Sequence, residues 1–193
     1  MQRPPFRRPS FLLSIASKLR HPQLNYNGAM YTSWYSGISK RFCDSASRRL
    51  LRGIDKILVF AVAIAYIATI VWMIVNRDMR LVKFFCVPAA TFVIATLLRA
   101  AINAPRPYET YSISPILEAD TKGKSLPSRH AASACVIACA FLWLNPIAGI
   151  ICWIAAIAIA ALRVIGGVHF ARDVIAAAVL AIAFAAIGFL AIP

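Results

Sequence analysis

Long apolar runs with few or no charges are the feature that most constrains how this chain can fold. The first, residues 57–75, has 19 residues without a charge, and as a helix it spans about 28 Å, enough to cross the hydrocarbon core of a bilayer. Inside a bilayer the backbone polar groups must be satisfied internally, which favours helices. Four further runs occupy residues 81–98, 131–144, 146–162 and 174–192. We therefore predict an all-α integral membrane helical bundle with five transmembrane helices.

Composition and charge favour a membrane protein over a soluble protein that binds nucleic acid. Hydrophobic residues make up 61% of the 193 residues, which is more than a soluble domain of this size carries. The net charge is +14, from 21 Lys and Arg against 7 Asp and Glu. Beside apolar spans, such an excess indicates anionic headgroups or phosphorylated lipids. We expect the bilayer and a phosphorylated membrane lipid as partners and no nucleic acid, and the sequence leaves the oligomeric state open.

The amino-terminal part of the chain differs from the rest. Residues 1–52 contain ten Lys and Arg but only one acidic residue, Asp44. We divide the chain into this basic segment, which we expect to be disordered or to lie at the membrane interface, and a membrane-embedded domain, residues 53–193. Met30 is an alternative start, so the sequence leaves open whether residues 1–29 belong to the mature chain.

The order of the spans places two polar segments on the same side of the membrane. Residues 99–130 follow the second span, and residues 163–173 follow the fourth. The chain crosses the membrane twice between them, so both segments lie at one face whichever way the protein is inserted. The side chains of the two segments can therefore form a single site.

The segment 163–173 carries a histidine and an aspartate at helical spacing. Asp173 follows His169 by four residues, so on a helix both side chains share one face. A carboxylate beside an imidazole fixes its tautomer and makes it a better base or nucleophile. The alternative is an interfacial charge cluster in which Arg163 and its neighbours face lipid headgroups.

The segment 99–130 adds cations, a hydroxyl group and a second histidine, His130. The guanidinium groups of arginine match phosphate oxygens, and the backbone N–H groups at a helix start bind anions. Two histidines suit a covalent phosphoryl transfer, in which one attacks phosphorus and the other protonates the leaving oxygen. The sequence has no acidic cluster to hold a metal, so we expect the arginines to neutralise the charge, with no metal and no cofactor.

Three short motifs in these segments resemble those of the type 2 phosphatidic acid phosphatase family. The family pattern is Lys-x6-Arg-Pro, then Pro-Ser-Gly-His, then Ser-Arg-x5-His-x3-Asp. The family also includes bacterial undecaprenyl-diphosphate and phosphatidylglycerophosphate phosphatases and the soluble vanadium haloperoxidases. The resemblance covers roughly residues 54–192. The matching motifs here are Arg99-x6-Arg106-Pro107, Pro127-Ser128-Arg129-His130 and Arg163-x5-His169-x3-Asp173.

The resemblance implies a role for each motif residue. His169 corresponds to the nucleophile that becomes phosphohistidine, Asp173 to the carboxylate that orients it, and His130 to the general acid. The family reaction needs no metal. The remaining positions correspond to a phosphate cradle, namely Arg99, Arg106, Ser128, Arg129 and Arg163.

The sequence departs from the family pattern at three positions. Arg99 stands where the family has lysine, Arg129 where it has glycine, and Leu162 where it has serine. None of these changes removes a residue that performs covalent chemistry. Arg99 keeps the charge but is bulkier and forked, and the glycine position normally allows a close backbone approach.

Three of the cradle residues have other possible roles. Arg99 can end the second span as a snorkelling side chain. Arg129 can form a surface ion pair with Glu118 or Asp120. Ser128 can cap the helix that follows, a role compatible with phosphate contact.

Together these observations predict a lipid phosphate phosphatase, a metal-independent hydrolase. We expect it to be a multi-pass protein of the cell membrane, located in the inner membrane of a bacterium. The substrate stays open among phosphatidic acid, phosphatidylglycerophosphate and undecaprenyl diphosphate. The alternative is a catalytically inactive relative that binds or moves phospholipids. The basic tail favours a cytoplasmic active site, whereas the resemblance favours the opposite face.

Overall fold

The computed structural model describes residues 22–42, 44–118 and 122–191, and this part of the chain is all-helical. The prediction of an all-α fold is therefore confirmed. In chain order the helices are α2 (Pro22–Lys40), α3 (Ser45–Val75), α4 (Leu81–Ile102), α5 (Pro107–Thr110), α6 (Arg129–Leu144), α7 (Pro146–Ile165), α8 (Ala171–Ala186) and the short π-helix η1 (Ile187–Ala191).

Four helical segments are long and apolar enough to cross a membrane. They are Ser45–Val75, Leu81–Thr110, Pro146–Ile165 and Ala171–Leu190. The predicted third span is α6, which has 16 residues and a length of about 24 Å. The five predicted spans thus correspond to four span-length segments and one shorter apolar helix, and the protein is a multi-pass membrane protein.

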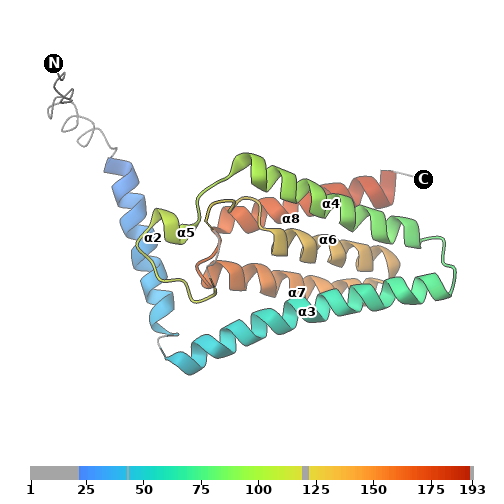
Figure 1. Cartoon of the computed structure of the whole chain (residues 1–193), viewed down its shortest axis with the longest axis horizontal. Helices are drawn as coiled ribbons and strands as arrows, with labels where there is room; N and C mark the ends of the chain where they lie inside the picture. Colours follow the sequence, from blue (N-terminus) through green and yellow to red (C-terminus); the bar gives the residue numbers. More distant parts are fainter. Residues whose placement is uncertain (1–21, 43, 119–121, 192–193) are drawn as a thin grey trace, which may run out of the picture.

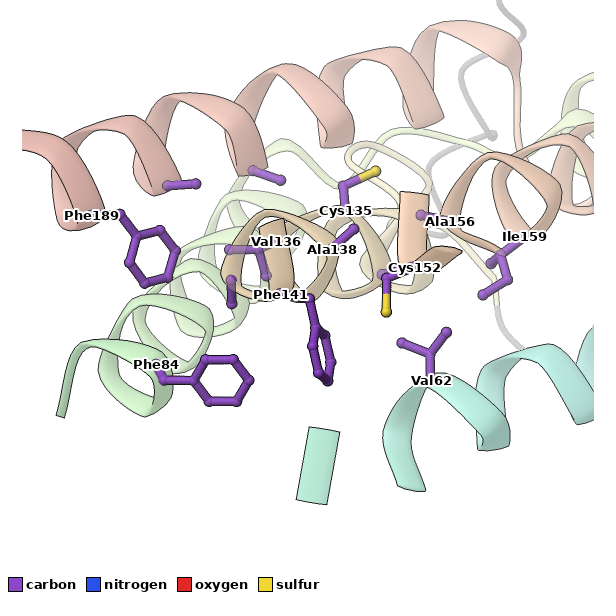
Figure 2. Packing of buried hydrophobic residues seen from close by; sticks show 14 of the residues in the cluster. Val62, Phe84, Cys135, Val136, Ala138, Phe141, Cys152, Ala156, Ile159 and Phe189 are labelled. Carbon is purple, nitrogen blue, oxygen red and sulfur yellow. The ribbon is translucent and has the colours of Figure 1, made fainter. Parts of the chain in front are cut away.

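Helix α6 lies at the centre of the bundle and packs against α3, α4, α7 and α8. Figure 2 shows side chains of neighbouring helices around it, including Val62 of α3 and Phe84 of α4. Five of the eight buried residues of α6 are alanines, and small side chains let helices approach closely. At Gly149 of α7 an added Cβ would lie 2.3 Å from the Cα of Leu142, so only glycine permits this contact.

The outer surface of the bundle is apolar. Along α3 the side chains of Ile57, Phe60, Ile64 and Ile67 are all more than half exposed. Their spacing of three and four residues places them on one face of the helix. A continuous exposed apolar face of this kind suits contact with lipid hydrocarbon.

The connections of the bundle alternate between its two ends. In Figure 1 the α4–α6 and α7–α8 connections lie at the end that also carries α2 and α5, called the site end below, while the α3–α4 and α6–α7 turns lie at the other. Backbone hydrogen bonds join the two polar segments, from Ile116 N–H to the Gly166 carbonyl (3.0 Å) and from Ser128 N–H to the Asp173 carbonyl (3.1 Å). The two polar segments therefore meet at one end of the bundle, as the order of the spans predicts.

Part of the basic segment 1–52 is helical. Residues 22–40 form α2, which crosses the site end of the bundle (Figure 1). Residues 45–52 are already the first turns of α3, whose start is capped by the side chain of Asp44 accepting from Ser47 N–H at 2.9 Å. Residues 1–21 lie outside the described residues. Helix α3 passes through residue 53 without a break, and the division of the chain there stays a prediction.

Aromatic side chains attach α2 to the loops of the site end. The Tyr31 ring lies 4.8 Å from that of Tyr111 and 5.4 Å from that of Phe170. The hydroxyl group of Tyr35 accepts from Ile116 N–H at 3.2 Å. At Gly167, where φ is +74°, an added Cβ would lie 2.5 Å from the Tyr35 hydroxyl oxygen. Helix α2 thus covers the loop that carries His169.

Candidate active site

A tight turn between α7 and α8 positions His169. The carbonyl oxygen of Arg163 accepts hydrogen bonds from the N–H groups of Val168 and His169, both at 3.2 Å. Helix α8 then starts at Ala171, and the side chain of Asp173 in its first turn accepts from Phe170 N–H at 3.0 Å. The helix start therefore fixes the carboxylate, and the positive end of the helix dipole stabilises its charge.

His169 and Asp173 form a buried pair with Ser125. The Nδ1 atom of His169 lies 3.4 Å from Oδ2 of Asp173. The hydroxyl group of Ser125 donates to the same Oδ2 and also lies 3.4 Å from Nδ1. The exposed fractions are 2% for His169 and 0% for the other two. With its Nδ1 proton directed at this cluster, the ring carries its lone pair on Nε2.

The surroundings of His169 favour a neutral imidazole. Burial lowers the pKa of His169 below its ordinary value of 6.5, and the contact with Asp173 opposes this shift. Near neutral pH the ring therefore keeps a free lone pair, which a nucleophile requires. The Nε2 atom makes no hydrogen bond with any described residue.

The second histidine, His130, occupies the first turn of α6 and faces the same charged region. The ionisable side chains near it include Arg163, His169, Arg129 and Arg99. His130 is exposed and borders two cavities of about 320 Å³ each. One cavity is mainly apolar and the other is lined by charged residues of α3 and α7.

Two further predicted phosphate ligands, Arg99 and Arg106, are buried. Arg99 lies in the last turn of α4 with 7% of its surface exposed, and Arg106 is 6% exposed. Arg106 and Arg129 both act electrostatically on Arg99. The alternative of a snorkelling Arg99 is wrong, because the side chain is buried within the bundle.

Loop contacts hold Arg106 in this position. Its Nε donates to the carbonyl of Gly123 at 3.1 Å. The side chain of Glu109 accepts from the N–H groups of both Arg106 and Gly123, each at 2.8 Å from its Oε2. These bonds join the start and the end of the α4–α6 connection, so the arginine and the Ser125 region are fixed relative to each other.

Ser128 and Arg129 start α6. Ser128 occupies the N-cap position, but its side chain makes no capping bond. Its Oγ is buried and has no partner among the described residues, so this hydroxyl group is free to bind a ligand. For Arg129, the predicted ion-pair alternative with Glu118 is absent from the described residues, because Glu118 pairs instead with Lys56 at 3.5 Å; Asp120 lies outside the described residues.

Arg163 has a partner that the sequence analysis did not single out. Its Nη2 atom lies 2.9 Å from Oδ2 of Asp55 on α3, and both side chains are mostly buried. A lone carboxylate just before an apolar span is a weak signal of function. Ser125 was also missed as a site residue, because nothing in its spacing points to Asp173, 48 residues further along the chain.

The predicted site residues thus lie at the site end, on α4, the start of α5, α6, the end of α7, the α7–α8 turn and the start of α8. The described residues contain no group of three or more His, Cys, Asp or Glu that could hold a metal ion. A buried His–Asp pair, a second histidine and several arginines form a cluster that can bind an anion and transfer a proton.

Comparison with known proteins identifies the family. The sequence model of the PAP2 superfamily matches residues 80–193, more than half of the chain, and the protein belongs to this superfamily. No curated protein matches the sequence.

Two solved structures are similar to this chain. The crystal structure of Aquifex aeolicus LpxE has 19% sequence identity, a TM-score of 0.55 and a match covering 95% of each chain. That of a transmembrane PAP2 type phosphatidylglycerolphosphate phosphatase from Bacillus subtilis has 20% identity and a TM-score of 0.61, and the match covers 92% of this chain and 90% of the other. At these identities the similarity establishes the fold.

Proposed function

We propose that this protein is a membrane lipid phosphate phosphatase that hydrolyses a phosphomonoester or diphosphate of a lipid through a phosphohistidine intermediate on His169. The observation that carries the proposal is the buried His169–Asp173 pair, which lies among arginines at one end of an apolar helical bundle. Membership of the PAP2 superfamily supports the same activity. We place the protein in the cell membrane, the inner membrane of a bacterium.

In the first step Nε2 of His169 attacks phosphorus, and the bond from phosphorus to the leaving oxygen breaks. Asp173 accepts from Nδ1 and stabilises the positive charge that develops on the ring. His130 donates a proton to the leaving oxygen, so a lipid alcohol departs from a monoester, or a lipid monophosphate from a diphosphate. In the second step His130 takes a proton from water, which attacks the phosphohistidine and releases inorganic phosphate.

The cationic groups neutralise the phosphoryl oxygens in both steps, and neither a metal nor a cofactor takes part in the proposed mechanism. Transition-state charge in phosphoryl transfer spreads over the equatorial oxygens, where fixed donors are most effective. The unpartnered hydroxyl group of Ser128 and the first N–H groups of α6 add donors beside the arginines. The proposed cradle consists of Arg99, Arg106, Ser128, Arg129 and Arg163.

The cavities beside His130 support a lipid as the substrate. The apolar cavity extends from Arg129 and His130 along Val59, Phe92 and Ile137. A phosphate in the arginine cluster therefore lies next to a space lined by hydrocarbon side chains. Phosphatidic acid, phosphatidylglycerophosphate and undecaprenyl diphosphate all combine a phosphate with long apolar chains.

The experiment is release of inorganic phosphate from these three lipids by purified protein in detergent, with and without excess chelator. The proposal predicts release from at least one lipid at a rate that chelator does not change. Loss of activity in chelator, with recovery in magnesium, would contradict the metal-free mechanism. Binding of the lipids without any phosphate release would favour the alternative, an inactive relative that binds or moves phospholipids.

A further inference from the structure

We propose that Asp55 is a positioning residue that orients Arg163 for binding of the substrate phosphate. Asp55 lies on α3, outside the residues 80–193 that the superfamily model matches. The inference rests on the proposed function, in which Arg163 contacts phosphate. It extends the site to a helix that none of the three sequence motifs includes.

The geometry of the pair is specific. Arg163 donates from Nη2 to Oδ2 of Asp55 at 2.9 Å, across 108 residues of sequence. The side chains are 14% and 8% exposed, respectively. Both residues border the charged cavity next to His130. Because α3 packs directly on α7, the carboxylate reaches the guanidinium without any intervening group.

The pair is only partly satisfied, which points to a ligand. Oδ1 of Asp55 and Nε of Arg163 are both buried and have no partner among the described residues. Taking two charges out of water is costly, and full hydrogen bonding is needed to offset that cost. An arginine held through one nitrogen, with a second nitrogen unpaired beside a cavity, retains a donor for a phosphate oxygen.

The charge of Asp55 also matters for the position of Arg163. The cationic group of Arg106 acts on Arg163 electrostatically, and Asp55 is the carboxylate that opposes it. Without this carboxylate, repulsion among the cations would move the Arg163 side chain away from the phosphate site. Asp55 therefore holds Arg163 beside the other arginines of the site before the substrate binds.

The test compares Asp55→Asn and Asp55→Glu with the wild-type protein, and Asp78→Asn serves as the matched control. Asp78 pairs with Arg80 at 2.7 Å in the α3–α4 turn at the other end of the bundle. We expect Asp55→Asn to lower kcat/KM and weaken inhibition by inorganic phosphate, each by about 10- to 100-fold. Asp55→Glu keeps the charge and should recover part of both, while Asp78→Asn should change neither.

A double-mutant cycle separates positioning from general stability. In an Arg163→Gln background, Asp55→Asn should cause little further loss, because the residue through which it acts is already gone. Losses that simply add, or an unchanged inhibition constant for phosphate in folded Asp55→Asn protein, would overturn the inference. If Asp55→Asn does not fold, Asp55→Glu takes its place in the cycle: a smaller loss that disappears in the Arg163→Gln background supports the inference, and a loss that adds to that of Arg163→Gln overturns it.

The outcome also separates this inference from the proposed function. Wild-type protein that releases no phosphate from any lipid, but binds inorganic phosphate less tightly after Asp55→Asn, would overturn the proposed function and support the role of Asp55. Phosphate release by the wild type, with the same kcat/KM and the same phosphate affinity in Asp55→Asn, would support the proposed function and overturn the role of Asp55. Thermal stabilisation by added inorganic phosphate measures the binding in both cases.

Discussion

Nδ1 of His169 lies 3.4 Å from Oδ2 of Asp173, one helical turn further along the chain. The same oxygen also accepts from Phe170 N–H and from the Ser125 hydroxyl group. Oδ1 has no hydrogen-bond partner among the described residues. The carboxylate is therefore fixed by the start of α8, and its charge acts on the imidazole ring.

Asp173→Asn should keep the fold and slow turnover by about 10²- to 10⁴-fold. An amide can still form hydrogen bonds at this position, but it no longer stabilises the positive charge that develops on the ring. The measurement is kcat for amounts of folded protein matched by thermal unfolding. A rate equal to that of the wild type would contradict the assigned role.

Ser125→Ala should lower kcat by about tenfold, since it removes a hydrogen bond to a charged group. The hydroxyl group touches Asp173 and lies beside Nδ1 of His169, so its loss leaves the pair less well held. Ser36→Ala is the control, because that hydroxyl group donates to the Ser33 carbonyl on the exposed surface of α2. Equal rates for the two variants would show that Ser125 has no part in the site.

The pH dependence of kcat/KM should follow His169. Burial lowers its pKa below 6.5, and the attacking form is neutral. Activity should therefore persist below pH 6.5 and fall only as the pH drops through the lowered pKa. Because the charge of Asp173 raises the pKa of His169, Asp173→Asn should move this acidic fall in kcat/KM to still lower pH. If the fall stays at the same pH in the variant, it reports ionisation of the substrate instead.

The loss of rate caused by His130→Ala should depend on the leaving group of the substrate. The variant lacks the proposed proton donor, so hydrolysis of a lipid phosphate should slow by about 10²- to 10⁴-fold. A nitrophenyl phosphate, whose leaving group needs no protonation, should be hydrolysed with a much smaller loss. The same loss for both substrates would contradict the role of His130 as general acid.

The parts of the site that depend on residue spacing and on the order of the spans could be predicted from the sequence. The four-residue interval between His169 and Asp173 places both side chains on one face of a helix. The two spans between the polar segments bring these segments to the same side. Spacing reports on one helix at a time, and it cannot reveal partners that meet only when helices pack. Ser125 lies 48 residues from its partner, and Asp55 lies 108 residues from Arg163.

The apolar run 131–144 already predicts a third span shorter than the others, and α6 has 16 residues. The helix α2 could not be predicted in the same way. Helix α2 lies in a stretch whose composition suggested disorder. Its order comes from long-range contacts, such as those of Tyr31 with Tyr111 and Phe170.

The most direct test of the account is to trap the covalent intermediate on His169. Wild-type protein is mixed briefly with a radiolabelled lipid phosphate and quenched in base, in which phosphohistidine survives, whereas acid removes it. We predict acid-labile label on the wild type and on His130→Ala supplied with a labelled aryl phosphate, and none on His169→Ala matched for folded amount. His169→Ala protein that still hydrolyses lipid phosphate at the wild-type rate would contradict the central claim.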